Sequence, residues 1–402
     1  MFEKAQFTLV IEHFEAIFDK NISSAAISRQ RLCKRTDLMK TNKAQSKLVH
    51  QRASIITFFA ELLQNILAVF FLTAVGIMSV STVSANPGNL ISKTMCIYDP
   101  VGANGPVFTQ MKDYQVAALD WGAKLTMKAY TDERVVAEDF KAGACDLMLV
   151  TGFKGREFNP FTGTLDSIGS MPSYEHLKVA VDTLSGPKAQ KLMQHNGYEV
   201  IGLMPAGAAY LYVNDRSINS VADLSGKRIG ILSNDPAQKT LVLNVGASPI
   251  GSSMANLYPK FNNGAIDICA GPAVLYDAME LYKGIGKKGG IIKFPLAQLT
   301  MQLIIKDDAD FTPKFRQSSR DYASSQFTVA TTILKSSEDQ IPSDTWIDIP
   351  NVQKAEYEEM LRQARLSLKK EGVYDGKMLT LMRKIRCKMS PTNSECSAAD
   401  KE

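Results

Sequence analysis

Short apolar runs alternate with amphipathic runs along residues 94–152, and this alternation constrains the fold of the 402-residue chain most strongly. The strand-like runs and the helical runs between them follow in the order 94–99, 108–122, 124–130, 132–143 and 144–152. The last run is continuously apolar, as is typical of a strand buried in a parallel sheet. Since strand–helix–strand units form right-handed crossovers between parallel strands, the pattern predicts an α/β fold.

The rest of the chain continues the alternation and ends in helices. Strand-like runs at 198–215 and 292–308 flank a second set of short strands and helices. The run 354–372 has an acidic first turn, a basic last turn and a terminal glycine, as expected of a helix. A chain of this length has room for two domains.

An apolar stretch near the N-terminus predicts export. Residues 55–78 are mostly apolar, but three polar residues leave an apolar core only at 66–78, diluted by Thr73. A bilayer span needs about 20 apolar residues, whereas a shorter core suits a signal peptide. Small residues at 83–85 favour cleavage before Asn86. An uncleaved anchor over 55–78 is the alternative.

We expect residues 39–85 to form this signal peptide, with its h-region at 66–78. Residues 1–38 are interpreted as an upstream extension, and a cytoplasmic tail on an anchored protein is the alternative. On either interpretation the body, residues 86–402, lies outside the cytoplasm, and the membrane is contacted only through the N-terminal segment.

The body is nearly neutral. Residues 1–85 carry ten basic and six acidic side chains, so they supply most of the net charge of +5. Nucleic-acid binding requires a basic face that neutralises phosphates, so this class of function is not expected.

The sequence gives no indication of a catalytic or metal centre. It has no CxxC or HxxxH spacing, and the body histidines, His176 and His195, lie in helix-like runs. No nucleophile, base and orienting group can be assembled from these motifs. We therefore expect no enzyme activity, no metal and no cofactor.

Five of the six cysteines lie in the body, where an oxidising compartment favours pairing. Cys387 and Cys396 flank a proline-containing turn and are the favoured disulfide. Cys96 and Cys145 lie in two strand-like runs that could be neighbours, and they form a weaker second candidate.

Four segments resemble, in the correct order, the TRAP-type (DctP-like) periplasmic solute-binding proteins. They are "KLTMKAYTDERVVAEDFKAGACDLMLV" (124–150), "SMPSYEHLKVAVDTLSGPKAQKLM" (170–193), "INSVADLSGKRIGIL" (218–232) and "GASPIGSSMANLYPKFNNGAIDICAGP" (246–272). The chain is also similar to the AdeT-type group of solute-binding proteins, some of which are labelled as RND-type efflux components. A pump itself is not expected, because the chain has one apolar segment rather than many.

The resemblance implies a two-lobed, type II-like Venus-flytrap fold that closes on a small molecule, with hinge strands and a helical C-terminal segment. We expect residues 86–209 and 298–338 to form lobe I, and residues 210–297 and 339–402 to form lobe II. In open α/β sheets, ligands bind beyond the carboxyl ends of the strands.

The chain departs from the family pattern at the site. The position of the family's carboxylate-clamping arginine is Gly230, and a nearby asparagine position is Ser233. An aromatic position is Met254, a polar position is Gly271, and a second arginine position falls near Tyr210. The carboxylate clamp is therefore not evident, although Gly230→Arg is expected to restore some carboxylate binding if the geometry is retained.

Arg228 is the residue that could replace this clamp, because it lies two residues before Gly230 and faces the same side of a strand. A surface arginine at the strand entrance is the favoured alternative. Asp99, Asp166 and Asp235 could face a cation, or could serve as turn or cap residues. The predicted ligand-binding residues are Asp99, Asn104, Thr151, Phe153, Tyr210, Tyr212, Arg228, Ser233, Met254 and Gly271.

A pocket lined by these residues suits an aromatic-stacked, amine-bearing or apolar solute. The first hypothesis is a periplasmic protein that captures a small molecule and delivers it to inner-membrane transporter subunits. The alternative is an accessory or structural protein of a transport or RND-type efflux system, in which the scaffold remains but classical carboxylate binding is lost.

Overall fold

The computed structural model describes residues 90–402 with the exception of residues 234 and 308–309. The signal peptide and the upstream extension predicted for residues 1–85 lie outside this range. From Ala85 onward the chain forms one compact unit. Within the described range, no helix has both the length and the apolar character needed to cross a membrane.

A mixed sheet runs through the whole unit in the order β2-β1-β3-β9-β5-β8-β6-β7, with β4 pairing β5 and β10 pairing β9. The strands are β1 (Ile91–Tyr98), β2 (Ala123–Tyr130), β3 (Leu147–Thr151), β4 (Gln194–His195), β5 (Tyr198–Val213), β6 (Arg228–Leu232), β7 (Ser248–Ser252), β8 (Ile268–Pro272), β9 (Gly290–Lys306) and β10 (Trp346–Ile347). Strands β1, β2 and β3 pair in parallel, as the alternation predicts. Strand β6 pairs in parallel with β7 and β8, so each end of the sheet is an α/β unit. We call the unit with β1, β2 and β3 the first lobe and the unit with β6, β7 and β8 the second lobe.

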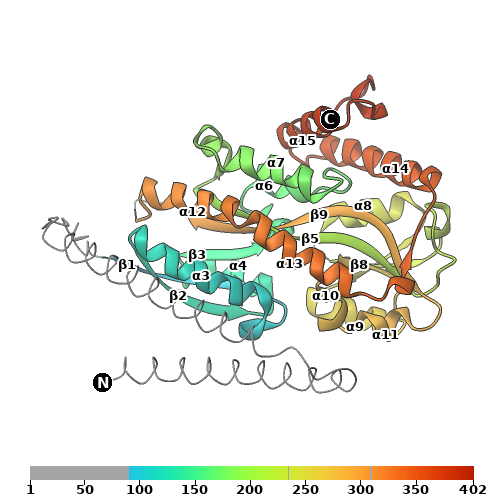
Figure 1. Cartoon of the computed structure of the whole chain (residues 1–402), viewed down its shortest axis with the longest axis horizontal. Coiled ribbons are helices and arrows are strands. Elements are labelled where there is room, and N and C mark those ends of the chain that lie inside the picture. The colour runs from blue at the N-terminus through green and yellow to red at the C-terminus, as the bar shows by residue number, and fades with distance from the viewer. Residues whose placement is uncertain (1–89, 234, 308–309) are drawn as a thin grey trace, which may run out of the picture. The chain divides into compact units, whose positions relative to one another are not determined.

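The two longest strands, β5 and β9, connect these units. They pair antiparallel with each other, and β9 also pairs with β3 while β5 pairs with β8. Their ladder has register shifts at Val200/Gly202, Pro205/Gly207 and Ala209/Leu211. Such irregularities bend strands locally. Figure 1 shows both strands running from one lobe into the other, as expected of hinge strands.

Helices cover both lobes. Those of eight or more residues are α3 (Pro106–Asp120), α4 (Glu133–Ala142), α7 (Tyr174–Ser185), α8 (Pro236–Asn244), α9 (Met254–Asn262), α12 (Pro313–Ser325), α13 (Phe327–Gln340), α14 (Asn351–Lys370) and α15 (Gly376–Met389). The shorter ones are α5 (Gly152–Gly155), α6 (Pro160–Gly163), α10 (Leu275–Ala278) and α11 (Leu281–Ile285).

Helix α4 illustrates how the sequence sets these elements. The Asp132 side chain caps its first turn by accepting a hydrogen bond from the backbone N–H of Arg134 at 2.9 Å. Gly143 ends it with a φ of +83°, a left-handed conformation that favours glycine. Val136 and Phe140 form its buried face. The helix predicted at 132–143 is therefore present.

The C-terminal helices join the two lobes instead of belonging to the second alone. Helix α14 packs against α8 of the second lobe, whereas α15 packs against α7 and α6 of the first. The lobe boundary predicted for 339–402 differs here because side chains from both helices bind the first lobe. Arg365 donates to the carbonyl of Ile168 at 3.0 Å, and Arg386 donates to that of Ser170 at 2.6 Å.

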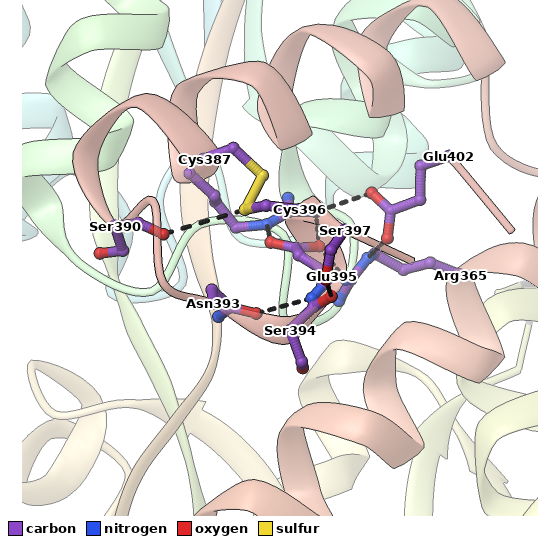
Figure 2. The surroundings of a disulfide bond; sticks show 10 residues. Arg365, Cys387, Ser390, Asn393, Ser394, Glu395, Cys396, Ser397 and Glu402 are labelled. Atoms are coloured by element: carbon purple, nitrogen blue, oxygen red, sulfur yellow. Dashed lines mark hydrogen bonds and ion pairs between the residues drawn. A yellow bond between two sulfur atoms is a disulfide. The ribbon is translucent and has the colours of Figure 1, made fainter. Parts of the chain in front are cut away.

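These two arginines also hold the last residues of the sequence. Glu402 receives hydrogen bonds from Arg365 Nε at 2.6 Å and from Arg386 Nη2 at 2.8 Å. Glu395 pairs with Arg386, and all four side chains are buried. Figure 2 shows Arg365, Glu395 and Glu402 beside the disulfide between Cys387 and Cys396.

Both cysteine pairs predicted from the sequence form disulfides. Cys96 of β1 is bonded to Cys145, which lies two residues before β3, so the bond crosses the core of the first lobe. Cys387 and Cys396 link the end of α15 to the turn that follows it. Cys269, on β8, is free and buried.

Candidate functional site

The ends of four strands converge on a cleft between the lobes. Strands β1 and β3 end at Tyr98 and Thr151 in the first lobe, and β6 and β8 end at Leu232 and Pro272 in the second. All four residues line one cavity of about 150 Å³, which we call the inner chamber. This is the place where an open α/β sheet binds ligands.

The inner chamber is mostly apolar and is built from both lobes. Its walls include three aromatic side chains, Tyr98, Phe153 and Tyr258, together with Met254. The backbone at Gly230 and Gly271 completes the wall on the second lobe. The arrangement suits an apolar group that both lobes contact at once.

A more polar cavity of about 220 Å³, the outer chamber, lies next to the inner one. The two share Phe153, Leu232 and Met254. The remaining outer walls carry charged and hydroxyl groups, which are Asp132, Glu133, Arg134, Lys154, Ser233, Asp235, Ser252 and Ser253. A bound molecule can therefore place an apolar part in one chamber and a polar part in the other.

Glu133 lines the outer chamber and is 7 % exposed. Its Oε2 accepts hydrogen bonds from the Thr151 hydroxyl at 2.7 Å and the Thr151 N–H at 3.4 Å. Thr151 itself lines the inner chamber. Burial raises the pKa of Glu133 above its usual value, because the ionised form loses hydration.

An ion pair joins the lobes at the mouth of the cleft. Arg156, which follows α5 in the first lobe, lies 3.5 Å from Asp235, which caps α8 in the second. The guanidinium of Arg156 also lies 5.1 Å from the centre of the Tyr374 ring. These contacts engage Nη1 and the ring-facing side of the guanidinium and favour the closed arrangement of the lobes, whereas the buried Nη2 of Arg156 has no hydrogen-bond partner among the described residues.

The three aspartates predicted near the cleft serve as caps and internal supports. Asp99 accepts hydrogen bonds from the backbone N–H groups of Val101 and Phe108, and Asp235 accepts one from Ala237. Asp166 is fully buried and accepts from the hydroxyl and N–H of Thr300. Burial raises the pKa of Asp166 to about 7.

Five of the ten predicted binding residues line the chambers. Thr151, Phe153, Met254 and Gly271 border the inner chamber, and Ser233, Phe153 and Met254 border the outer one. These residues are distant in sequence, and the fold brings them together from the ends of four strands, β3, β6, β7 and β8.

The other five lie elsewhere. Asp99 is a buried cap, and Asn104 is exposed on a turn. Tyr210 stacks edge-on against Trp346 at 5.1 Å, and the Tyr212 hydroxyl donates to the carbonyl of Pro272 from a fully buried position. Since side chains alternate along a strand, the neighbouring Ala209, rather than either tyrosine, faces the cleft.

Arg228 is a surface residue and supplies no clamp. It forms a salt bridge with Asp267 at 2.6 Å, and its side chain is 46 % exposed. The bond from Arg228 lowers the pKa of Asp267 to about 2. The suggestion that Arg228 replaces the family's arginine in the site is therefore wrong, and the surface alternative is the one observed.

Gly230 leaves no room for a side chain, so Gly230→Arg is expected to destabilise the fold without restoring carboxylate binding. A Cβ there would lie 2.4 Å from Ile266 Cδ1 and 2.6 Å from Leu257 Cδ1. Overpacking of this kind costs about 1–3 kcal/mol. Urea unfolding measures the loss, with Ser248→Arg on the exposed edge of β7 as the control. Unchanged stability together with tight binding of a dicarboxylate would contradict this expectation.

Sequence reasoning missed Glu133, Arg156 and two tyrosines in the wall of the inner chamber, Tyr98 and Tyr258. Glu133 occupies the first position of a helix, where an acidic residue is already explained by the helix dipole. Arg156 is recognisable only once the fold brings Asp235 beside it, 79 residues away in sequence.

Comparisons with known proteins agree with the observed architecture. Residues 115–401 match the family model described as "Solute-binding protein AdeT 1/2". The chain is 44% identical over 304 residues to the probable solute-binding protein AdeT1 of Acinetobacter baumannii, covering 76% of this chain and all of that protein.

Solved structures share the fold at low sequence identity. A TRAP periplasmic solute-binding protein of Sulfitobacter sp. NAS-14.1 with bound β-D-galacturonate aligns with a TM-score of 0.61, 14% identity and coverage of 73% and 99% of the two chains. One of Shewanella oneidensis with bound succinate aligns with a TM-score of 0.60, 10% identity and coverage of 74% and 99%. The predicted two-lobed fold is thus confirmed, and the chain belongs to the AdeT 1/2 family of solute-binding proteins.

Proposed function

We propose that this protein captures a small molecule in the cleft between its lobes and delivers it to transporter subunits in the inner membrane. The observation that carries the proposal is the inner chamber. It lies at the converging ends of four strands and takes its walls from both lobes, so a ligand bound there holds the lobes together.

We further propose that the protein acts in the periplasm after export through its N-terminal segment. The family membership and the two disulfides support this location, because disulfides persist in oxidising compartments. A solute-binding protein there needs a membrane partner to move its ligand inward.

The solute is proposed to differ from those of the structural neighbours described above, which are carboxylates. Gly230 supplies no clamp, Arg228 is on the surface, and Arg156 is paired with Asp235. We expect succinate and hexuronates to bind with dissociation constants above roughly 0.1 mM, which corresponds to about −5.5 kcal/mol or weaker.

A thermal-shift screen of the purified protein tests the proposed function. The library contains carboxylates, amines, neutral aromatics, sugars and peptides. A ligand present at 100 times its dissociation constant stabilises the folded state by about 2.7 kcal/mol, which raises the melting temperature by several degrees. If no compound in any class shifts the transition, solute capture is contradicted and the accessory role is favoured.

A further inference from the structure

The carboxylate of Glu133 is the charged group in the chambers that lacks a counter-ion. It is more than nine-tenths buried, and within the described part of the chain no Lys or Arg nitrogen lies within the 4.0 Å that defines a salt bridge. Its two hydrogen bonds both go from Thr151 to Oε2. Oε1 therefore retains accepting capacity, and Glu133 lines the outer chamber.

Neighbouring cations form no salt bridge with Glu133, because other acids bind them, although the positive charge of Lys154 acts against the rise in the pKa of Glu133. Arg134 binds Asp132 through two hydrogen bonds of 2.7 and 3.2 Å. Lys154 pairs with Glu157 at 3.3 Å. The side chains that line the outer chamber include three acids, Asp132, Glu133 and Asp235, and two bases, Arg134 and Lys154, so this lining has a negative surplus.

The inner chamber limits the size and polarity of the part of a solute that is attached to a positively charged group. Apolar and aromatic side chains dominate its walls, with Tyr98, Phe153 and Tyr258 among them. An apolar cavity of about 150 Å³ accommodates a group of the size of benzene. Aromatic rings also stabilise nearby cations through their negative faces.

From this geometry we infer that the cleft selects a solute with a cationic amine attached to an apolar body of about one ring. The ammonium group binds Glu133 Oε1 in the outer chamber, and the apolar body occupies the inner chamber. This inference rests on the proposed function, since it specifies the chemical class of the captured solute.

Desolvation of the Glu133 carboxylate favours an ammonium group over a neutral hydrogen-bond donor. A hydroxyl group could also donate to Glu133, but it would leave the buried negative charge uncompensated. An ammonium group supplies both the hydrogen bond and the opposite charge, and charge-assisted hydrogen bonds are the stronger kind. A carboxylate at the same point would be repelled.

Calorimetric titration with three probes of similar shape tests the inference. The probes are 2-phenylethylamine, which is an ammonium ion at pH 7.4, neutral 2-phenylethanol and anionic phenylacetate. The purified protein is expected to bind the amine roughly 10- to 100-fold more tightly than the alcohol, and phenylacetate most weakly. Equal affinity for the amine and the alcohol, preference for phenylacetate, or binding of none of the three would overturn the inference.

Two variants separate recognition of charge from a structural role of Glu133. Glu133→Gln keeps the shape and the Thr151 contact, and it should lose roughly 10- to 100-fold affinity for the amine while binding the alcohol as before. Glu138→Gln, on the exposed side of the same helix, is the matched control and should change neither affinity. Undiminished amine binding in Glu133→Gln would contradict the inference.

If Glu133→Gln does not fold, the salt dependence of ligand affinity in the wild-type protein tests the inference instead. Amine affinity should fall from 0.05 to 0.5 M NaCl, while alcohol affinity stays constant. Failure of this inference can be distinguished from failure of the proposed function. If the proposed function is wrong, no library compound stabilises the protein. If only this inference is wrong, a ligand of another class still binds in the cleft.

Discussion

Replacing Cys96 and Cys145 together by alanine is expected to lower the free energy of unfolding by about 4 kcal/mol. The bond closes a loop with a sequence separation of 49 residues, and the chain-entropy relation gives about 4 kcal/mol for a loop of this length. Both cysteines are fully buried in the first lobe, so their loss also removes packing. Urea unfolding of the wild type and the double variant gives the difference.

The second disulfide provides the matched control. Cys387 and Cys396 are separated by 9 residues, for which the same relation gives about 2.5 kcal/mol, so their double alanine variant should be less destabilised. They are also partly exposed, and a mild reductant should open this bond first under native conditions. A larger stability loss from the second pair would contradict the assignment of the first bond to the core.

Filling the inner chamber is expected to abolish ligand binding while leaving the protein folded. Ala270 of β8 lines the inner chamber and an adjacent apolar cavity. In Ala270→Trp the indole would occupy the space that an apolar ligand needs, and affinity should fall at least ~100-fold, or roughly 2.8 kcal/mol. The measurement is calorimetric titration of the ligand found by the thermal-shift screen.

Ala265→Trp is the control, because Ala265 is exposed in the turn before β8. It should bind the ligand as the wild type does. Overpacking in Ala270→Trp costs about 1–3 kcal/mol, so circular dichroism must show that the unliganded variant is folded. Normal affinity in the folded Ala270→Trp protein would place the binding site outside the inner chamber.

Much of the fold could be predicted from the sequence because local signals repeat along the chain. Alternating strands and helices over 94–152 specify the first lobe, with Asp132 capping and Gly143 ending one of its helices. Two of the family-like segments, 218–232 and 246–272, specify the second lobe. The position of α15 was less predictable. It depends on Arg365 and Arg386 finding carbonyl groups in the first lobe, which is a long-range contact.

The binding residues were predicted less well, for two physical reasons. The sequence predicts strand β5, but which of its faces meets the cleft depends on bulges that sequence patterns do not locate. The sequence therefore favours Tyr210 and Tyr212 as binding residues, whereas Ala209 lines the inner chamber. Glu133 and Arg156 acquire their roles only from partners distant in sequence or from burial.

The central claim is that a small molecule is held between the lobes. A crystal structure of the protein with the ligand found by the screen tests this claim most directly. The predicted result is ligand density in the inner chamber, in contact with Phe153 of the first lobe and Met254 of the second. Density confined to the surface of one lobe, with the chamber empty, would contradict it.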